Sequence, residues 1–236
     1  MLKDLARGMR IKLLHVRAAG KWKTSLPKRS LIIAPHPDDE VLGCGGLIHR
    51  MVNQGRDVHV AILTGGEKSL VEVEDEELKC VRRRLALHAA SQLGLAEDKI
   101  HFLDYPDGGV SAACSETSKL QALISNIRPS AIFIPHRGEG WNDHVVVRSI
   151  VQQLDLGEAS LYEYCVWMWY YNIWGLDWKN ANLLSMNDTE YKAKRDAMKV
   201  YLEALAPCGK PYSGVLPSVL VWAHRWKREL YFKVNI

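Results

Sequence analysis

Short apolar runs recur along the chain, and each is followed by a polar loop. The runs are rich in β-branched and aromatic residues and span only a few positions, which is typical of buried strands. They cover residues 30–36, 57–66, 99–106, 130–136 and 161–171. The segments between and after them have helical patterns, at residues 42–54, 75–93, 116–127, 143–154 and 188–205.

The alternation of strands and helices predicts an α/β fold with a mostly parallel sheet, because helices supply the long crossovers that parallel strands need. Right-handed crossovers then give a Rossmann-like three-layer α/β/α arrangement. After residue 178 the pattern weakens. Asp188 is the expected N-cap of the last clear helix, and a final helix or strand leads to Ile236. No repeat or linker is evident, so residues 1–236 are predicted to form a single domain.

Residues 1–28 are basic and loosely amphipathic, which predicts a helical extension at the N-terminus. They lack the continuous apolar core of a signal peptide, and no run in the chain reaches the roughly 18 apolar residues of a transmembrane segment. The favoured interpretation is a helix packed on the domain of a cytoplasmic protein. Because basic residues are interleaved with Leu and Met, a peripheral contact at the inner membrane face is the alternative.

Composition narrows the function only slightly. The 236 residues have a net charge of +4, which is too weak to indicate nucleic-acid binding. The five cysteines are scattered and form no paired motif, so we expect reduced thiols rather than disulfides or a thiolate metal site. The sequence leaves the oligomeric state open, a homo-oligomer included.

Two polar clusters follow predicted strands. "HPDDE" at residues 36–40 follows the first strand, and "HRGEGWNDH" at residues 136–144 follows the fourth. Ligands of open parallel sheets bind beyond the carboxyl ends of the strands, so both clusters should reach the same edge. Catalytic zinc commonly takes three His, Asp or Glu ligands and a water, a set that His36, Asp39 and His144 can supply. Asp38 would remain free to accept a proton.

The motif "APHPDDE" followed by "VLGCGG", with the distal "NDH", resembles the PIG-L/LmbE family of zinc-dependent N-deacetylases. "ILTGGE", "RRRLALHAASQLG" and "FLDYPDGG" extend the resemblance over most of the chain. It implies zinc ligands at His36, Asp39 and His144. The sequence leaves the metal itself open, since iron could occupy the same ligands and affinity and availability together decide which metal binds. The resemblance also implies Asp38 as the general base on a zinc-bound water that attacks the acetamide of an amino sugar.

The distal motif departs from the family pattern. The family often has H-x-D-H, whose first histidine stabilises the oxyanion or protonates the leaving amine, and here that position is Trp141. Either His136 substitutes for it or Asp38 shuttles the proton itself. Asp143 is expected to orient His36 or His144 through a hydrogen bond, or to cap the following helix.

Other residues are candidates for substrate binding or packing. Arg82 is expected on the active-site side of its helix, Asp107 at sugar hydroxyls or in a turn, and Trp141 beside the substrate. The aromatic segment 162–178 would stack on a sugar or form core, and residues 210–217 would form a lid. Glu40 is interpreted as structural, and "GCGG" as a means of close backbone packing.

The leading hypothesis is therefore a zinc-dependent N-deacetylase of an N-acetylglucosamine-type conjugate, with a small-molecule, lipid-linked or nucleotide-linked substrate. The alternatives are a zinc amidase acting on a non-sugar amide and a catalytically impaired, sugar-binding member of the family. The sequence does not identify the group attached to the sugar.

Overall fold

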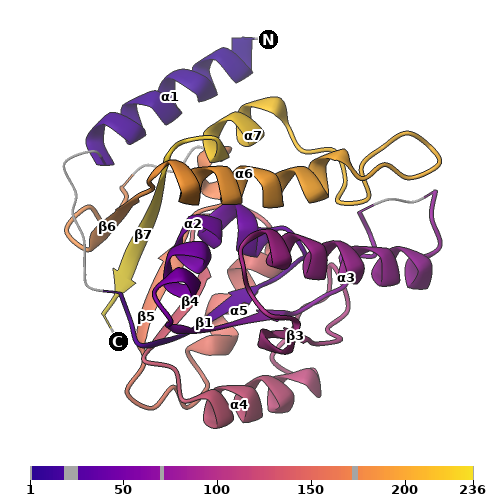
Figure 1. Ribbon diagram of the computed structural model, residues 1–236, viewed down its shortest axis with the longest axis vertical. Helices are drawn as coiled ribbons and strands as arrows, with labels where there is room; N and C mark the ends of the chain where they lie inside the picture. The colour runs from indigo at the N-terminus through magenta and orange to yellow at the C-terminus, as the bar shows by residue number, and fades with distance from the viewer. Residues whose placement is uncertain (1, 19–25, 70–71, 172–174, 236) are drawn as a thin grey trace.

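The computed structural model describes residues 2–18, 26–69, 72–171 and 175–235 (Figure 1). In chain order, the elements are α1 (Leu2–Ala18), β1 (Arg29–Ala34), α2 (Asp39–Asn53), β2 (Asp57–Ile62), α3 (Asp75–Gln92), η1 (Glu97–Lys99), β3 (Ile100–Phe102), α4 (Glu116–Ile127), β4 (Ala131–Pro135), α5 (Asn142–Val151), β5 (Ser160–Tyr164), η2 (Trp167–Trp169), β6 (Ala181–Ser185), α6 (Asp188–Glu203), α7 (Ser218–His224) and β7 (Arg228–Val234).

The strands form one seven-stranded sheet in the order β3-β2-β1-β4-β5-β7-β6. The five strands β1 to β5 pair in parallel, while β7 is antiparallel to both β5 and β6. The predicted α/β fold with a mostly parallel sheet is thus confirmed. Among the described residues, no helix is long and apolar enough to span a bilayer.

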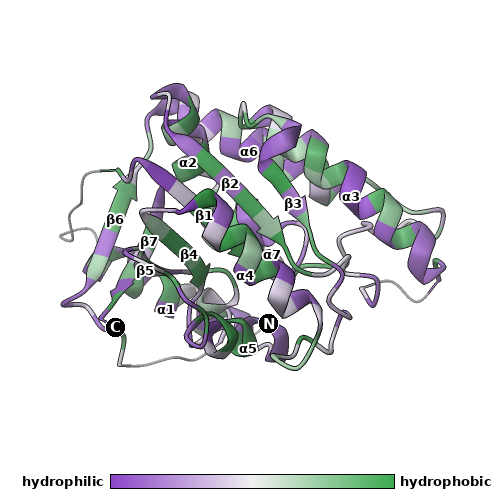
Figure 2. Cartoon of the chain, turned by 90° about the horizontal axis from the view of Figure 1, so that it is seen from below, coloured by the Kyte–Doolittle hydropathy of each residue, from purple (hydrophilic) through white to green (hydrophobic). Residues whose placement is uncertain are grey.

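Helices cover both faces of the sheet and make three layers (Figure 1). One hydrophobic core joins α2, α3 and α6 to one face, and a second joins α4 and α5 to the other. A third cluster joins α1, η2 and α7 to β6 and β7. In Figure 2 the central strand β4 is coloured as largely hydrophobic, as expected for a strand covered on both faces.

Some predictions about local structure were wrong. The strand predicted at residues 161–171 ends at Tyr164, because the next backbone amides, of Val166, Trp167 and Met168, donate to the Glu139 carboxylate instead of a neighbouring strand. The N-cap of α6 is Asn187 rather than Asp188, in a capping box with Glu190. Strand β6 was not predicted. Residues 172–174 of the aromatic segment and 19–25 of the N-terminal extension lie outside the described residues.

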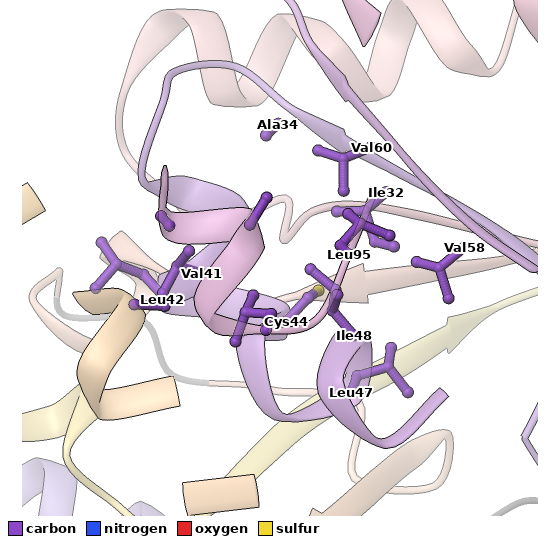
Figure 3. Packing of buried hydrophobic residues seen from close by; sticks show 14 of the residues in the cluster. Ile32, Ala34, Val41, Leu42, Cys44, Leu47, Ile48, Val58, Val60 and Leu95 are labelled. Carbon is purple, nitrogen blue, oxygen red and sulfur yellow. The ribbon is translucent and has the colours of Figure 1, made fainter. Parts of the chain in front are cut away.

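Helix α2 packs unusually close to its neighbours, in agreement with the interpretation of "GCGG". Val41, Leu42, Cys44, Leu47 and Ile48 of this helix belong to the hydrophobic core that also contains residues of β1 and β2 (Figure 3). A Cβ atom at Gly43 would lie only 2.3 Å from a ring carbon of Tyr164, and one at Gly46 would lie 2.3 Å from the Met186 sulfur. Glycine at these positions lets the helix that begins at Asp39 pack directly on the sheet.

We predict that Gly43→Ala lowers the free energy of unfolding by about 1–3 kcal/mol, the usual cost of overpacking. Tyr164 cannot swing aside, because its ring is fully buried and its hydroxyl donates to the Ile33 carbonyl oxygen over 2.9 Å. Gly8→Ala in α1 is the matched control, since a Cβ atom there meets nothing within 4 Å. It should be neutral or stabilising, by up to about 1 kcal/mol. Urea denaturation of both variants tests this, and equal stabilities would contradict it.

Candidate metal centre

The two polar clusters meet at the carboxyl ends of adjacent strands. β1 pairs in parallel with β4, and the chain turns from β1 into α2 and from β4 into α5 at the same edge of the sheet. Crossovers leave these two strands in opposite directions, since β2 and β3 lie beyond β1 and β5 lies beyond β4. Such a switch point is where open α/β sheets bind ligands.

His36, Asp39 and His144 place three donor atoms in a nearly equilateral triangle. His36 Nδ1 lies 3.3 Å from Asp39 Oδ2, His144 Nε2 lies 3.2 Å from the same oxygen, and the two nitrogens are 3.3 Å apart. Zinc bonds of about 2.0–2.1 Å separate tetrahedral ligands by about 3.3–3.4 Å. The spacing therefore fits three protein ligands of one tetrahedral ion, with the fourth position directed away from them.

Carboxylates hold the outer nitrogens of both histidines. His36 Nε2 lies 3.0 Å from Asp107 Oδ1 and 3.4 Å from Asp143 Oδ2. His144 Nδ1 lies 3.4 Å from Glu139 Oε2, and Glu139 is fully buried. A carboxylate at the outer nitrogen keeps a proton there and turns the lone pair of the other nitrogen inwards, as in metal-binding histidines generally. Asp143 was expected to orient either His36 or His144, and its carboxylate lies beside His36.

The site concentrates negative charge. Burial alone would lower the pKa of His144, but Asp39 and Glu139 raise it to about 9. In His36, burial has the same effect, and the bonds to Asp107, Asp143 and Asp39 raise the pKa well above its ordinary value. The buried imidazole of His144 and the partly buried imidazole of His36 are surrounded by carboxylates, an environment that favours a cation.

Asp38 is fixed beside the triangle by its own backbone. Its φ of 125° is in the region that favours glycine, so the conformation is strained and must be held by neighbours. Its amide donates to Glu40 Oε2 over 2.9 Å, and the Tyr201 hydroxyl donates to Glu40 Oε1 over 2.6 Å. Burial and the Asp39 charge raise the pKa of Asp38 to about 8. Glu40 is thus structural, as predicted, and its partner Tyr201 comes from α6.

Arg82 supports the same loop from α3. Its guanidinium donates to the carbonyl oxygens of Pro37 and Gly66 over 2.7 and 2.8 Å, and it lies 3.6 Å from the Asp38 carboxylate. The side chain is buried, although it still lines the pocket. Arg82 therefore places a positive charge next to the Asp38 carboxylate. Its contact with substrate stays a prediction.

A pocket of about 520 Å³ opens over these groups. Trp141 and Trp167 form an aromatic wall, with ring centroids 5.4 Å apart, and Trp141 is half exposed. Residues 213–216 of the predicted lid segment line another side. Asp107 also faces the pocket, with Oδ2 accepting from the Lys68 amide. The pocket therefore brings together His36, Asp38, Asp39, Arg82, Asp107, Trp141, Asp143 and His144.

His136 is the predicted site residue that the structure does not bring to this pocket. Its Nδ1 accepts from the Gly138 amide over 3.0 Å, and its Nε2 lies 3.6 Å from the buried Glu163. Burial together with Arg137 and Arg148 lowers its pKa to about 3. The prediction that His136 replaces the missing histidine as a proton donor is wrong on this geometry, because the buried ring lies against Glu163 of β5 and outside the pocket.

Glu139 and Tyr201 are site residues that sequence reasoning missed. Glu139 lies inside the distal cluster, so an acidic residue five positions before His144 was the available signal. Tyr201 lies 161 residues from Glu40, and no local pattern links the two.

Comparison with known proteins assigns the family. The sequence profile of the GlcNAc-PI de-N-acetylase family matches residues 31–154, which is more than half of the chain, and the chain belongs to this family. The diacetylchitobiose deacetylase of Thermococcus kodakarensis is 32% identical over 120 residues, which cover 50% of this chain and 45% of that protein. The first curated relatives are matched over only about a third to a half of their own length.

Solved structures confirm the fold. The N,N'-diacetylchitobiose deacetylase from Pyrococcus horikoshii superposes with a TM-score of 0.60 at 21% identity, covering 77% of this chain and 72% of that one. The 4-carboxy-2-hydroxymuconate hydratase GalB from Pseudomonas putida gives 0.60 at 19% identity, covering 88% and 97%. Since the same fold occurs in a hydratase, the fold alone does not define the reaction.

We predict that His144→Ala weakens zinc binding by more than the roughly 10–100-fold seen when outer carboxylates are removed, because it deletes a corner of the triangle. Glu139→Gln should fall within that range. His136→Ala is the matched control and should bind zinc as tightly as the unaltered protein, since its ring lies outside the pocket. Competition titration with a zinc chelator measures all three. Equal loss in His136→Ala and His144→Ala would contradict the assignment.

Proposed function

We propose that this protein is a zinc-dependent hydrolase that removes the acetyl group from an N-acetylglucosamine-type sugar conjugate. The observation that carries the proposal is the tetrahedral spacing of His36, Asp39 and His144 beside Asp38, at the base of a pocket with an aromatic wall. Membership of the GlcNAc-PI de-N-acetylase family and the similarity to a diacetylchitobiose deacetylase support the choice of substrate.

The metal ligands are His36, Asp39 and His144. When bound there, zinc supplies polarisation of a carbonyl and a lowered pKa for a water molecule, to about 7. Glu139, Asp107 and Asp143 hold the two imidazoles in the orientation that this requires, through their contacts with the outer ring nitrogens. When zinc is bound, the neutral His36 and His144 and the single Asp39 carboxylate would cancel only one of its two positive charges, and the remaining charge would favour the developing oxyanion.

Asp38 handles the proton. It accepts a proton from the attacking water while the oxygen bonds to the acetamide carbon, and the same proton then passes to nitrogen as the C–N bond breaks. Acetate and a free amine are the products. The route uses Asp38 twice because Trp141 occupies the position of the family's histidine and His136 lies outside the pocket. The Arg82 guanidinium, 3.6 Å away, stabilises the ionised carboxylate before the first transfer and after the second.

The pocket walls select a sugar. Trp141 and Trp167 present aromatic faces and edges on which a pyranose ring can stack, and Asp107 offers a carboxylate to hydroxyl groups. A volume of about 520 Å³ exceeds a single monosaccharide, so part of the attached group also enters. Apolar residues of the lid segment, Val215 and Leu216, would contact that attached group.

A second candidate is a sugar-binding member of the family with impaired catalysis. The specific observation in its favour is Trp141, which stands where the family often has a histidine that protonates the leaving amine. Among the site residues that we identify, Asp38 must then carry the proton without that histidine. An impaired protein would bind zinc and an N-acetyl sugar without releasing acetate.

The proposed function is tested by a screen for acetate release. We expect the zinc-loaded protein to deacetylate at least one member of a panel of free, nucleotide-linked and lipid-linked N-acetylglucosamine compounds. Chelation should abolish the activity and added zinc should restore it. Sugar binding without acetate release across the panel would favour the second candidate, and activity only on simple non-sugar acetamides would indicate a different amidase.

We predict that Asp38→Asn retains bound zinc and loses about 10²–10⁴-fold in kcat, because the amide cannot accept a proton. Asparagine is preferred to serine here, because it keeps the size and planar geometry of the aspartate side chain and removes only its ability to accept a proton. Metal content measured on the same sample separates loss of chemistry from loss of the ion. An unchanged kcat with full zinc occupancy would remove Asp38 from the proton-carrying role.

A further inference from the structure

Helix α1 has two apolar faces, and among the described residues only one of them packs against the rest of the protein. Ile11, Leu14 and Ala18 are buried against η2 and α7. On the opposite side, an exposed stripe consists of Leu5, Met9, Leu13 and Val16, which are 63%, 60%, 65% and 75% exposed. Their spacing of four, four and three residues places them along one face of the helix.

The charges beside the exposed stripe are basic. Lys12 and Arg17 are exposed at the two borders of the stripe, while the helix's acidic residue, Asp4, pairs with Arg7 over 3.1 Å. An apolar stripe bordered by lysine and arginine is complementary to a surface that is apolar within and negatively charged at its boundary. An anionic lipid bilayer has that character.

The helix is held rigidly against the wall of the active-site pocket. Arg10 is buried and donates to the carbonyl oxygens of Met168 and Trp169 in η2, and the Arg7 guanidinium lies 3.9 Å from the Tyr170 ring centre. The same short turn provides Trp167, which lines the pocket. The exposed stripe therefore lies across α1 from the turn that provides Trp167 to the pocket.

Exposed apolar residues continue from α1 towards the pocket rim. Trp222 on α7 is 41% exposed, and its ring lies 6.1 Å from that of His15 on α1. Val215, on the lid segment at the pocket, is 71% exposed. Figure 1 shows α1 and α7 side by side on the outside of the molecule, in agreement with their contacts. Tryptophan is a residue type favoured at the lipid–water interface.

We propose that the exposed stripe of α1 docks the protein on an anionic membrane surface and brings the pocket to substrates presented there. The stripe would lie in the interface plane, with Leu5, Met9, Leu13 and Val16 among the lipid chains and Lys12 and Arg17 at the head groups. Docking itself is independent of the proposed deacetylation. Only the consequence, preference for a lipid-linked amino sugar, rests on that function.

Co-sedimentation with vesicles tests the docking. The unaltered protein should bind vesicles of phosphatidylcholine with phosphatidylglycerol, and bind weakly to phosphatidylcholine alone. The double variant Met9→Gln, Leu13→Gln should bind the anionic vesicles at least about tenfold more weakly, because two apolar side chains no longer leave water. Lys12→Gln should weaken binding about fivefold and reduce its dependence on salt.

Leu205→Gln is the matched control, because this residue is 55% exposed in the turn after α6 and lies outside the stripe. It should bind vesicles like the unaltered protein, and all variants should keep the same melting temperature. Equal vesicle binding by the stripe variant and the unaltered protein would overturn the proposal. So would a dimer, seen by light scattering, that the stripe variant dissociates while vesicles bind neither form.

Activity distinguishes this proposal from the proposed function. Turnover of a water-soluble N-acetyl sugar should be the same for the stripe variant and the unaltered protein, whereas turnover of a vesicle-embedded substrate should fall with vesicle binding. Vesicle binding without any deacetylation would leave the docking intact and reject the function.

Discussion

The parallel pairing of β1 with β4 is the constraint on which the site depends. The register pairs Ser30, Leu31 and Ile32 with residues 131–133. The loops that follow the two strands therefore begin next to each other at the same edge of the sheet. The first loop contains His36 and Asp38, and the second leads through Glu139 to His144. A shift of register would move His144 away from Asp39 and separate donor atoms that now lie 3.2 Å apart. The close packing of the glycine-containing α2 fixes the first loop, since this helix begins at Asp39 itself.

Buried charge is balanced locally around this edge. Glu139 accepts from three backbone amides at the start of η2, so one carboxylate both ends the strand β5 and orients His144. Within the core, Glu229 accepts from the amides of Gly46 and Leu47 and pairs with Lys194, which also donates to the Leu42 carbonyl oxygen. Ionised groups remain buried in both places because each oxygen has donors, which offsets the loss of hydration. Stability and site geometry thus use the same hydrogen bonds.

Sequence patterns predicted much of the fold because they reflect local physics. The helix at residues 116–127 has the predicted bounds, since its end before Pro129 depends only on neighbouring residues. The strand predicted through residues 165–171 does not form, although its aromatic composition is typical of a strand. The Glu139 carboxylate, 26 residues or more away along the chain, accepts the hydrogen bonds of backbone amides in this segment. β6 was not predicted, because its pairing with the antiparallel β7 is decided by the sheet rather than by five residues of sequence.

The sequence by itself determined the chemical content of the site: the donor types, their attachment to the ends of two strands, and the loss of the family's histidine at Trp141. Local spacing was sufficient for this because His36, Asp38 and Asp39 belong to one turn. Only the tertiary structure decided which groups meet. In the folded chain, His136 lies against Glu163, and Glu139 lies at the outer nitrogen of His144. Tyr201 of α6 donates a hydrogen bond to Glu40 next to Asp38. These contacts span many residues, and they follow from how helices pack on the sheet, which no local pattern contains.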